Sequence, residues 1–239
     1  MSYFQFCPQT VIGREPNVNQ KIALPTLVFI VLTLVTGCNA VTGEAKRTIE
    51  YLLEQSPEAN LTAEEIEAFP YTALYMNMEN ASQSLVVLGY VDGNNFSWVS
   101  GENETVVTRY GRIIRTIGLH ANLRGISNLA NDPLLCVVTE PERCPTEWER
   151  EHDFELRDGQ QISRAVHSRF ERGERAVVSL PGGEVTATLV HEHVHVDMSA
   201  RDYVNEFWIE DDGHIVKSRQ MTLFNEPRFS LTQVKWVGR

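Results

Sequence analysis

The residues most suggestive of chemistry lie at positions 191–195, which read His-Glu-His-Val-His. His191, Glu192 and His195 match the H-E-x-x-H pattern of zinc proteases, in which two histidines bind the metal and the glutamate acts as general base. That mechanism requires a helix, because a helical turn brings positions i and i+4 together on one face. The flanking residues, VTATLV before the motif and VD after it, are typical of a strand. The match is therefore interpreted as accidental.

A strand would give the same histidines a different arrangement. Side chains alternate between the two faces of a strand, so His191, His193 and His195 would project from one face and could together bind Zn²⁺. No separate cluster of cysteines or carboxylates marks a fourth ligand. A solvated or pH-sensitive strand face is the favoured interpretation, and a metal-dependent hydrolase stays an alternative.

Other catalytic arrangements are not recognisable in the sequence, which contains no G-x-S-x-G elbow, phosphate-binding glycine loop or dinucleotide fingerprint. Scattered carboxylates such as Asp153, Glu155, Asp211 and Asp212 could pair as the acid and base of a glycosidase. The position of the last two in a turn favours a structural role. Trp98, Trp208 and Trp236 lie in predicted strands, where a core role is favoured over sugar stacking. We therefore expect no enzymatic activity and no cofactor.

A second chemical feature is Cys38, which ends the sequence Val-Thr-Gly-Cys. The preceding apolar stretch, 22–35, follows Lys21 and is shorter than the ~20 residues of a membrane-spanning helix. This order is that of a secretory signal, and its last four residues resemble a bacterial lipobox, whose cysteine receives a diacylglyceryl group. The sequence predicts a signal peptide over residues 1–37, removed in the mature protein, and a lipid anchor at Cys38. A chance cysteine after an ordinary signal peptide is the alternative.

The anchor sets the expected location of the protein. Acyl chains on Cys38 would tether a domain to the membrane without a spanning helix. By analogy with enterobacterial sorting, Asn39 in place of aspartate favours the outer membrane, with the domain on the periplasmic side. Export also makes a disulfide plausible between Cys136 and Cys144, which lack the CxxC spacing of redox or metal pairs.

The charge of the chain limits its partners. The net charge is −11, and removal of residues 1–37 leaves about −12. Proteins that bind nucleic acid need a surplus of lysine and arginine to neutralise phosphates. Nucleic acid is therefore excluded as an expected partner, and the membrane is contacted through the lipid anchor.

The elements that would carry these residues change in type along the chain. A helix is predicted over 44–55, and a second begins at Thr62, whose side chain and Glu65 form a capping box, and ends before Pro70. Residues 122–158 are interpreted as a surface excursion with one short helix. About ten strands joined by tight turns are predicted. They are Leu85–Val91, Phe96–Ser100, Thr105–Arg109, Arg112–Ile117, Ile162–Phe170, Arg175–Leu180, Glu184–Val196, Val204–Glu210, His214–Leu223 and Phe229–Val237.

This pattern predicts an all-β fold with minor N-terminal helices. The crossover helices that parallel strands need are missing, and a large antiparallel sheet tends to curl. We expect a single antiparallel meander curled into a barrel, half-barrel or curved sandwich. Residues 1–37 would form the signal peptide, 38–70 the lipid anchor, tether and short helices, and 71–239 the antiparallel β domain.

Several stretches of the predicted β domain resemble the YjbF/GfcB family of lipoproteins, encoded with exopolysaccharide and group 4 capsule secretion genes. The resemblance rests on 70–75, Trp98-Val99, the Thr108–Arg112 turn, Gly118-Leu119 and Ser218-Arg219-Gln220. It implies an all-β accessory protein anchored in the outer membrane, working with other polysaccharide-export proteins and without catalytic residues. An apolar or glycan carrier is the alternative. The His-rich strand departs from the family pattern.

Overall fold

The computed structural model describes residues 59–198, 202–222 and 227–238. Cys38 and the helix predicted over 44–55 lie outside these ranges, so both stay predictions. The described part contains one α-helix, two short 3₁₀ helices and twelve strands. They are α3 (Ala63–Ala68), β1 (Ala73–Met78), β2 (Ser84–Asp92), β3 (Asn95–Val99), β4 (Thr105–Arg109), β5 (Arg112–Ile117), β6 (Ala121–Ile126), η2 (Leu129–Asn131), η3 (Pro133–Leu135), β7 (Glu147–Leu156), β8 (Gln161–Leu180), β9 (Gly183–Val196), β10 (Tyr203–Ile209), β11 (Ile215–Gln220) and β12 (Phe229–Lys235).

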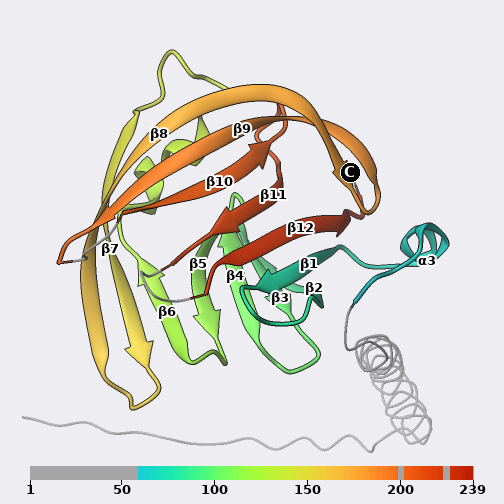
Figure 1. Cartoon of the computed structure of the whole chain (residues 1–239), viewed down its shortest axis with the longest axis horizontal. Coiled ribbons are helices and arrows are strands. Elements are labelled where there is room, and N and C mark those ends of the chain that lie inside the picture. The colour runs from blue at the N-terminus through green and yellow to red at the C-terminus, as the bar shows by residue number, and fades with distance from the viewer. Residues whose placement is uncertain (1–58, 199–201, 223–226, 239) are drawn as a thin grey trace, which may run out of the picture. The chain divides into compact units, whose positions relative to one another are not determined.

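The strands form one antiparallel sheet that is nearly closed into a barrel. Its order is β5-β4-β3-β2-β1-β12-β11-β10-β9-β8-β7-β6, so each strand pairs with its neighbour in sequence except where β1 pairs with β12. The two edges, β5 and β6, are also consecutive in the chain, and the Leu123 amide donates a 2.8 Å hydrogen bond to Thr116 Oγ1 between them. Figure 1 shows this arrangement, with β8 and β9 as the two longest arched strands. The predicted all-β, curled meander is confirmed.

The surface excursion predicted over 122–158 is wrong at both of its ends, which are strands. It contains β6 and β7, which pair with each other, and β7 also pairs with β8. Burial alternates along β7, but two of its four buried positions hold Arg150 and His152 rather than apolar residues. The expected apolar alternation was therefore hidden by polar residues on the inner face.

Two further differences concern strand boundaries. β1, at Ala73–Met78, was not among the predicted strands, and its first four residues are all buried, so it lacks alternation. The strands predicted over 162–170 and 175–180 are one strand, β8, whose register with β9 shifts between Arg172 and Arg175. A side chain at Gly173 would meet the Leu189 carbonyl oxygen at 3.1 Å, which explains the glycine at this bulge.

The helix α3 begins as the sequence predicts. The Thr62 hydroxyl accepts from the Glu65 amide, and the Glu65 carboxylate accepts from the Thr62 amide. Lys235 Nζ donates to the carbonyls of Ile66 and Glu67, which fixes α3 beside the end of β12. No helix among the described residues is long and apolar enough to span a membrane.

Candidate functional site

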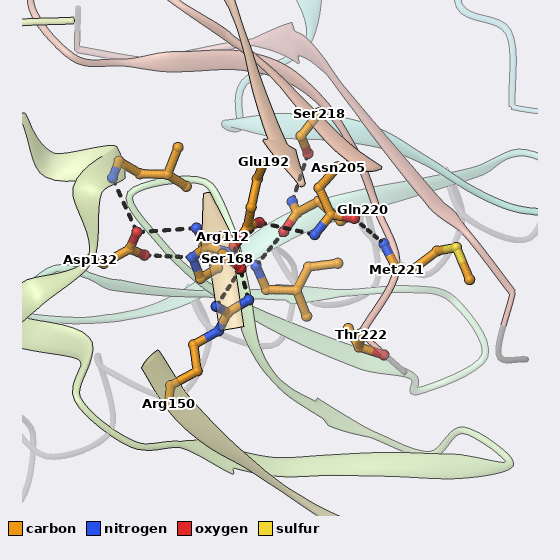
Figure 2. A network of polar contacts seen from close by, with 12 residues as sticks. Arg112, Asp132, Arg150, Ser168, Glu192, Asn205, Ser218, Gln220, Met221 and Thr222 are labelled. Carbon is orange, nitrogen blue, oxygen red and sulfur yellow. Dashed lines mark hydrogen bonds and ion pairs between the residues drawn. The ribbon is translucent and has the colours of Figure 1, made fainter. Parts of the chain in front are cut away.

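Two arginines and a glutamate meet inside the barrel. Arg112 is the first residue of β5, Arg150 lies in β7 and Glu192 in β9, and all three side chains are buried. Arg112 Nη1 lies 2.8 Å from Glu192 Oε2, and Arg150 Nη2 lies 2.9 Å from Glu192 Oε1. Figure 2 shows Glu192 between the two guanidinium groups. One carboxylate thus links three strands.

A second carboxylate balances the charge. Asp132 precedes η3 and pairs through both oxygens with Nε and Nη2 of Arg112. Asp132 Oδ1 also accepts from the Leu134 amide and so caps η3. Two guanidinium groups therefore face two carboxylates, which is the condition under which buried charges are tolerated in a protein interior.

Neutral side chains complete the hydrogen bonds of Glu192. The Ser168 hydroxyl and Asn205 Nδ2 donate to its two oxygens at 2.8 and 3.0 Å. Burial alone raises the pKa of Glu192, but the nearby guanidinium groups of Arg112 and Arg150 and these hydrogen bonds outweigh it and lower the pKa to about 2. The carboxylate is ionised throughout the physiological range.

Aromatic rings surround the two cations. The Arg112 guanidinium lies 4.7 Å from the ring centroid of Trp148 and 5.3 Å from that of Phe207, and the Arg150 guanidinium lies 4.0 Å from that of Trp148. Burial lowers the pKa of Arg150 to about 10, so this group remains charged at neutral pH. Burial acts in the same direction on the pKa of Arg112, but Asp132 and Glu192 outweigh it and raise that pKa.

His152 extends the network as a neutral group. Its Nδ1 lies 3.0 Å from the Thr222 carbonyl oxygen, and its Nε2 lies 3.0 Å from Arg150 Nε. A carbonyl can only accept and a guanidinium can only donate, so Nδ1 carries the proton and Nε2 accepts. Burial and the Arg150 charge lower the pKa of His152 to about 3, in agreement with this tautomer. His152 is therefore not a base at neutral pH.

Gln220 at the end of β11 ties the network to the β4–β5 turn. Its Oε1 accepts from the Ile113 amide at 3.0 Å, and its Nε2 donates to the Gly111 carbonyl and to the Ser218 hydroxyl, each at 2.8 Å. Figure 2 shows Gln220 close to Asn205, with Ser218 linked to Gln220. The network therefore joins strands that are far apart in the sheet order.

An aromatic cavity lies at the barrel end that carries the Tyr110–Gly111 turn. It measures about 360 Å³, and its walls include Phe96, Trp98 and Trp236. Trp98 is buried, as the core interpretation predicts, and its indole N–H donates to Thr108 Oγ1 at 2.8 Å. Trp236 is half-buried and borders the open space.

The histidines of the 191–195 motif project from the outer face of β9. Their side chains are 32, 40 and 55% exposed, and the nearest carboxylates lie 4.0 Å from His191 (Glu206), 3.3 Å from His193 (Glu171) and 2.7 Å from His195 (Asp202). Glu192 points to the opposite, interior face. The protease geometry is therefore absent, because the motif lies on a strand. Within the described ranges, no group of three or more histidine, cysteine or acidic side chains is arranged to hold a metal ion.

The remaining predicted residues are scattered. Cys136 and Cys144 form a disulfide with their Cα atoms 5.4 Å apart, in the segment that also carries Asp132. Asp211 lies in the β10–β11 turn and pairs with Arg175 on the surface. Trp208 contacts Lys217, whose Nζ lies 5.1 Å from the ring centroid.

The buried charge network was missed by the sequence analysis, although a signal for it exists. Glu192 is in phase with Val190 and Val194, and Arg150 is in phase with Trp148 and Phe154, on the faces that point inward. A charged residue at an apolar position of an alternating strand indicates a buried ion pair, because an unpaired charge there would be too costly. The partners themselves cannot be read this way, since Arg112 and Glu192 are 80 positions apart.

Three of the segments on which the family resemblance rests, 98–99, 108–112 and 218–220, come together around the cavity and the network. Trp98 donates to Thr108, Gln220 donates to Gly111 and Ser218, and Arg112 pairs with Glu192. Gly111 has a φ of +73°, and a side chain there would clash with Ile215 at 2.6 Å. These family-like segments therefore contact one another in the folded protein.

Comparisons with known proteins confirm the family resemblance. Residues 46–233 match the family described as "Group 4 capsule polysaccharide lipoprotein gfcB, YjbF". The chain is 29% identical to the lipoprotein YjbF of Escherichia coli (strain K12) over 197 residues, which cover 82% of this chain and 90% of that protein. It is 25% identical to the lipoprotein GfcB of the same strain over 202 residues, 82% of this chain and 91% of that protein.

A solved structure shares the fold. The crystal structure of the hypothetical lipoprotein YmcC from Escherichia coli (K12) superposes with a TM-score of 0.68 at 25% sequence identity. The superposition covers 75% of this chain and 91% of that one. The similarity therefore extends over nearly all of the solved protein.

Proposed function

Because the chain belongs to the YjbF/GfcB family of group 4 capsule polysaccharide lipoproteins, we propose that it is a non-enzymatic accessory factor in the secretion or assembly of capsule or exopolysaccharide. The observation that carries the proposal is the family match over residues 46–233, which spans almost all of the predicted mature protein. In this role the β domain would be held by acyl chains on Cys38 at the periplasmic face of the outer membrane and would contact other export proteins.

The interior of the barrel supports a role without catalysis. Each charged group of the network is already bound by protein groups: Arg112 by Asp132 and Glu192, and Arg150 by Glu192 and Ser168. A general acid or base works with a pKa near the operating pH. The pKa of Glu192, about 2, and that of His152, about 3, lie well below neutrality. The network is suited to holding strands together.

Deletion of the gene in the bacterium that encodes this chain tests the proposed role. We expect loss of surface polysaccharide with normal growth, and restoration by the wild-type gene. Cys38→Ala should fail to restore it, because the domain would lose its membrane anchor. Cys7→Ala is the matched control, since it changes a cysteine within the predicted signal peptide and should restore the polysaccharide fully. Intact surface polysaccharide after deletion would contradict the proposal.

The non-enzymatic part needs its own measurement. The purified lipoprotein is incubated with polysaccharide from the producing strain, and the chain-length distribution is followed by size-exclusion chromatography. We expect no change. Shortening or lengthening of the chains that disappears when the protein is heat-denatured would show that the protein is an enzyme.

A further inference from the structure

The aromatic cavity lies where three turns meet at one end of the barrel. Asn94 comes from the β2–β3 turn, Tyr110 from the β4–β5 turn and Asp212 from the β10–β11 turn, and Trp236 follows the end of β12. The volume of about 360 Å³ falls within the range of small-molecule pockets, roughly 300–1,000 Å³. Asn94 and Asp212 are exposed at the rim, so the mouth is polar and the walls are apolar.

The rings of the cavity are held in fixed orientations. Trp236 packs edge-to-face on Phe96 and His214, with centroid distances of 5.6 and 4.5 Å, and lies 6.1 Å from Trp98. His214 Nε2 is in turn 2.6 Å from Gln233 Oε1. An aromatic face that is already ordered loses little conformational entropy when a ligand packs on it.

The deep wall of the cavity carries hydroxyl groups with unused protons. Thr108 and Ser218 are both almost fully buried, and each hydroxyl accepts one hydrogen bond, from Trp98 Nε1 and Gln220 Nε2 respectively. A hydroxyl also has one proton to donate, and no acceptor for either proton is found among the described residues. The partly exposed Trp236 indole, which carries an N–H donor, also lines the cavity.

These features match a sugar better than an apolar ligand. A purely apolar molecule would cover the hydroxyls and the indole N–H without supplying acceptors, which costs free energy for each buried group. A pyranose ring has C–H groups that pack on an aromatic face and hydroxyl oxygens that accept hydrogen bonds at its edge.

We propose that the cavity lined by Phe96, Trp98, Thr108, Ser218 and Trp236 is a saccharide-binding site that takes a segment of the polysaccharide. This inference rests on the proposed function for the identity of the glycan. Trp236 stacks on a sugar ring, and the Thr108 and Ser218 hydroxyls donate to oxygens of the same unit. The accessory protein would thereby contact the polymer directly.

Binding to the mature lipoprotein, purified in detergent, tests the site. The probe is a set of oligosaccharides prepared by partial acid hydrolysis of the producing strain's polysaccharide, and dextran oligosaccharides serve as the unrelated glycan. We expect saturable binding of the former, weakened about tenfold or more by Trp236→Ala. Trp208→Ala is the matched control, because Trp208 is not one of the residues that line the cavity, and the affinity of this variant should stay within about twofold of wild type.

A footprint on the wild-type protein guards against a variant that fails to fold. Hydroxyl-radical oxidation followed by mass spectrometry should show that the oligosaccharides protect Trp236 and Phe96 and leave Trp208 unchanged. Absence of binding, equal affinity of the Trp236→Ala variant, or protection only outside the cavity would overturn the inference. Displacement of the oligosaccharides by dextran would also overturn it. Palmitate serves as the apolar probe, and protection of Trp236 by palmitate but not by the oligosaccharides would favour an apolar ligand instead.

The two proposals fail separately. If deletion abolishes surface polysaccharide but the oligosaccharides do not bind, the export role stands and the saccharide site is wrong. If the oligosaccharides bind at Trp236 but deletion leaves the polysaccharide intact, the site stands and the export role is wrong. In the host, we expect Trp236→Ala protein to be present at normal amount and to restore less polysaccharide than the Trp208→Ala protein.

Discussion

The two faces of β9 differ sharply in how their polar residues are held. On the inner face, Glu192 is fully buried and is bound by Arg112, Arg150, Ser168 and Asn205. On the outer face, the three histidines of 191–195 are partly exposed beside acidic side chains. Burial decides which ionic contacts matter, because exposed pairs contribute about 0–1 kcal/mol, whereas breaking a buried pair costs about 3–5 kcal/mol.

The largest effect is expected from removing the inner carboxylate. Glu192→Ala leaves Arg150 buried without a carboxylate partner and Arg112 paired with Asp132 alone, so we expect the free energy of unfolding to fall by about 3–5 kcal/mol. Urea unfolding at pH 7 measures this change. Glu171→Ala is the matched control, since Glu171 is exposed beside His193, and a change of about 0.5 kcal/mol or less is expected. Similar losses in both variants would remove the contrast between the faces.

The second prediction concerns the pH dependence of the free energy of unfolding, which we expect to reflect the inner residue His152. Its pKa is lowered from 6.5 to about 3 in the folded protein, by burial first and by Arg150 second. Between these values the unfolded chain binds a proton that the folded protein does not, so stability falls as pH decreases, by up to about 1.4 kcal/mol per pH unit. Below about pH 4.5 Glu192 adds a contribution of the same sign, since its folded pKa of about 2 is also lowered.

The histidine contribution can be isolated between pH 6.5 and 5.5, where Glu192 stays about nine-tenths ionised or more in both states. We expect His152→Gln to flatten the slope of unfolding free energy against pH in this window, whatever its effect on stability at pH 7. His195→Gln, on the outer face, should leave the slope largely intact. A wild-type protein whose stability is constant over this window would show that His152 is not held neutral by the fold.

The outer face of β9 was predictable from sequence, and the inner network was not. Alternation placed His191, His193 and His195 on one side of a strand, and turn residues such as Tyr110-Gly111 located several hairpins correctly. β7 was missed because Arg150 and His152 stand where apolar residues are expected. Their pairing depends on contacts across the barrel between distant strands, and local patterns carry no information about such partners.

The smallest effect is expected at the outer histidines. His191→Ala combined with His193→Ala removes two partly exposed side chains near Glu206 and Glu171, so the free energy of unfolding should change by about 0.5 kcal/mol or less. The same variant tests the metal hypothesis, because elemental analysis of purified protein should give the same zinc content as wild type. A stoichiometric zinc ion in the wild type that is lost in the variant would show that the outer histidines bind a metal. The two faces of β9 would then differ in what binds their polar side chains: other protein groups on the inner face and a metal ion on the outer face.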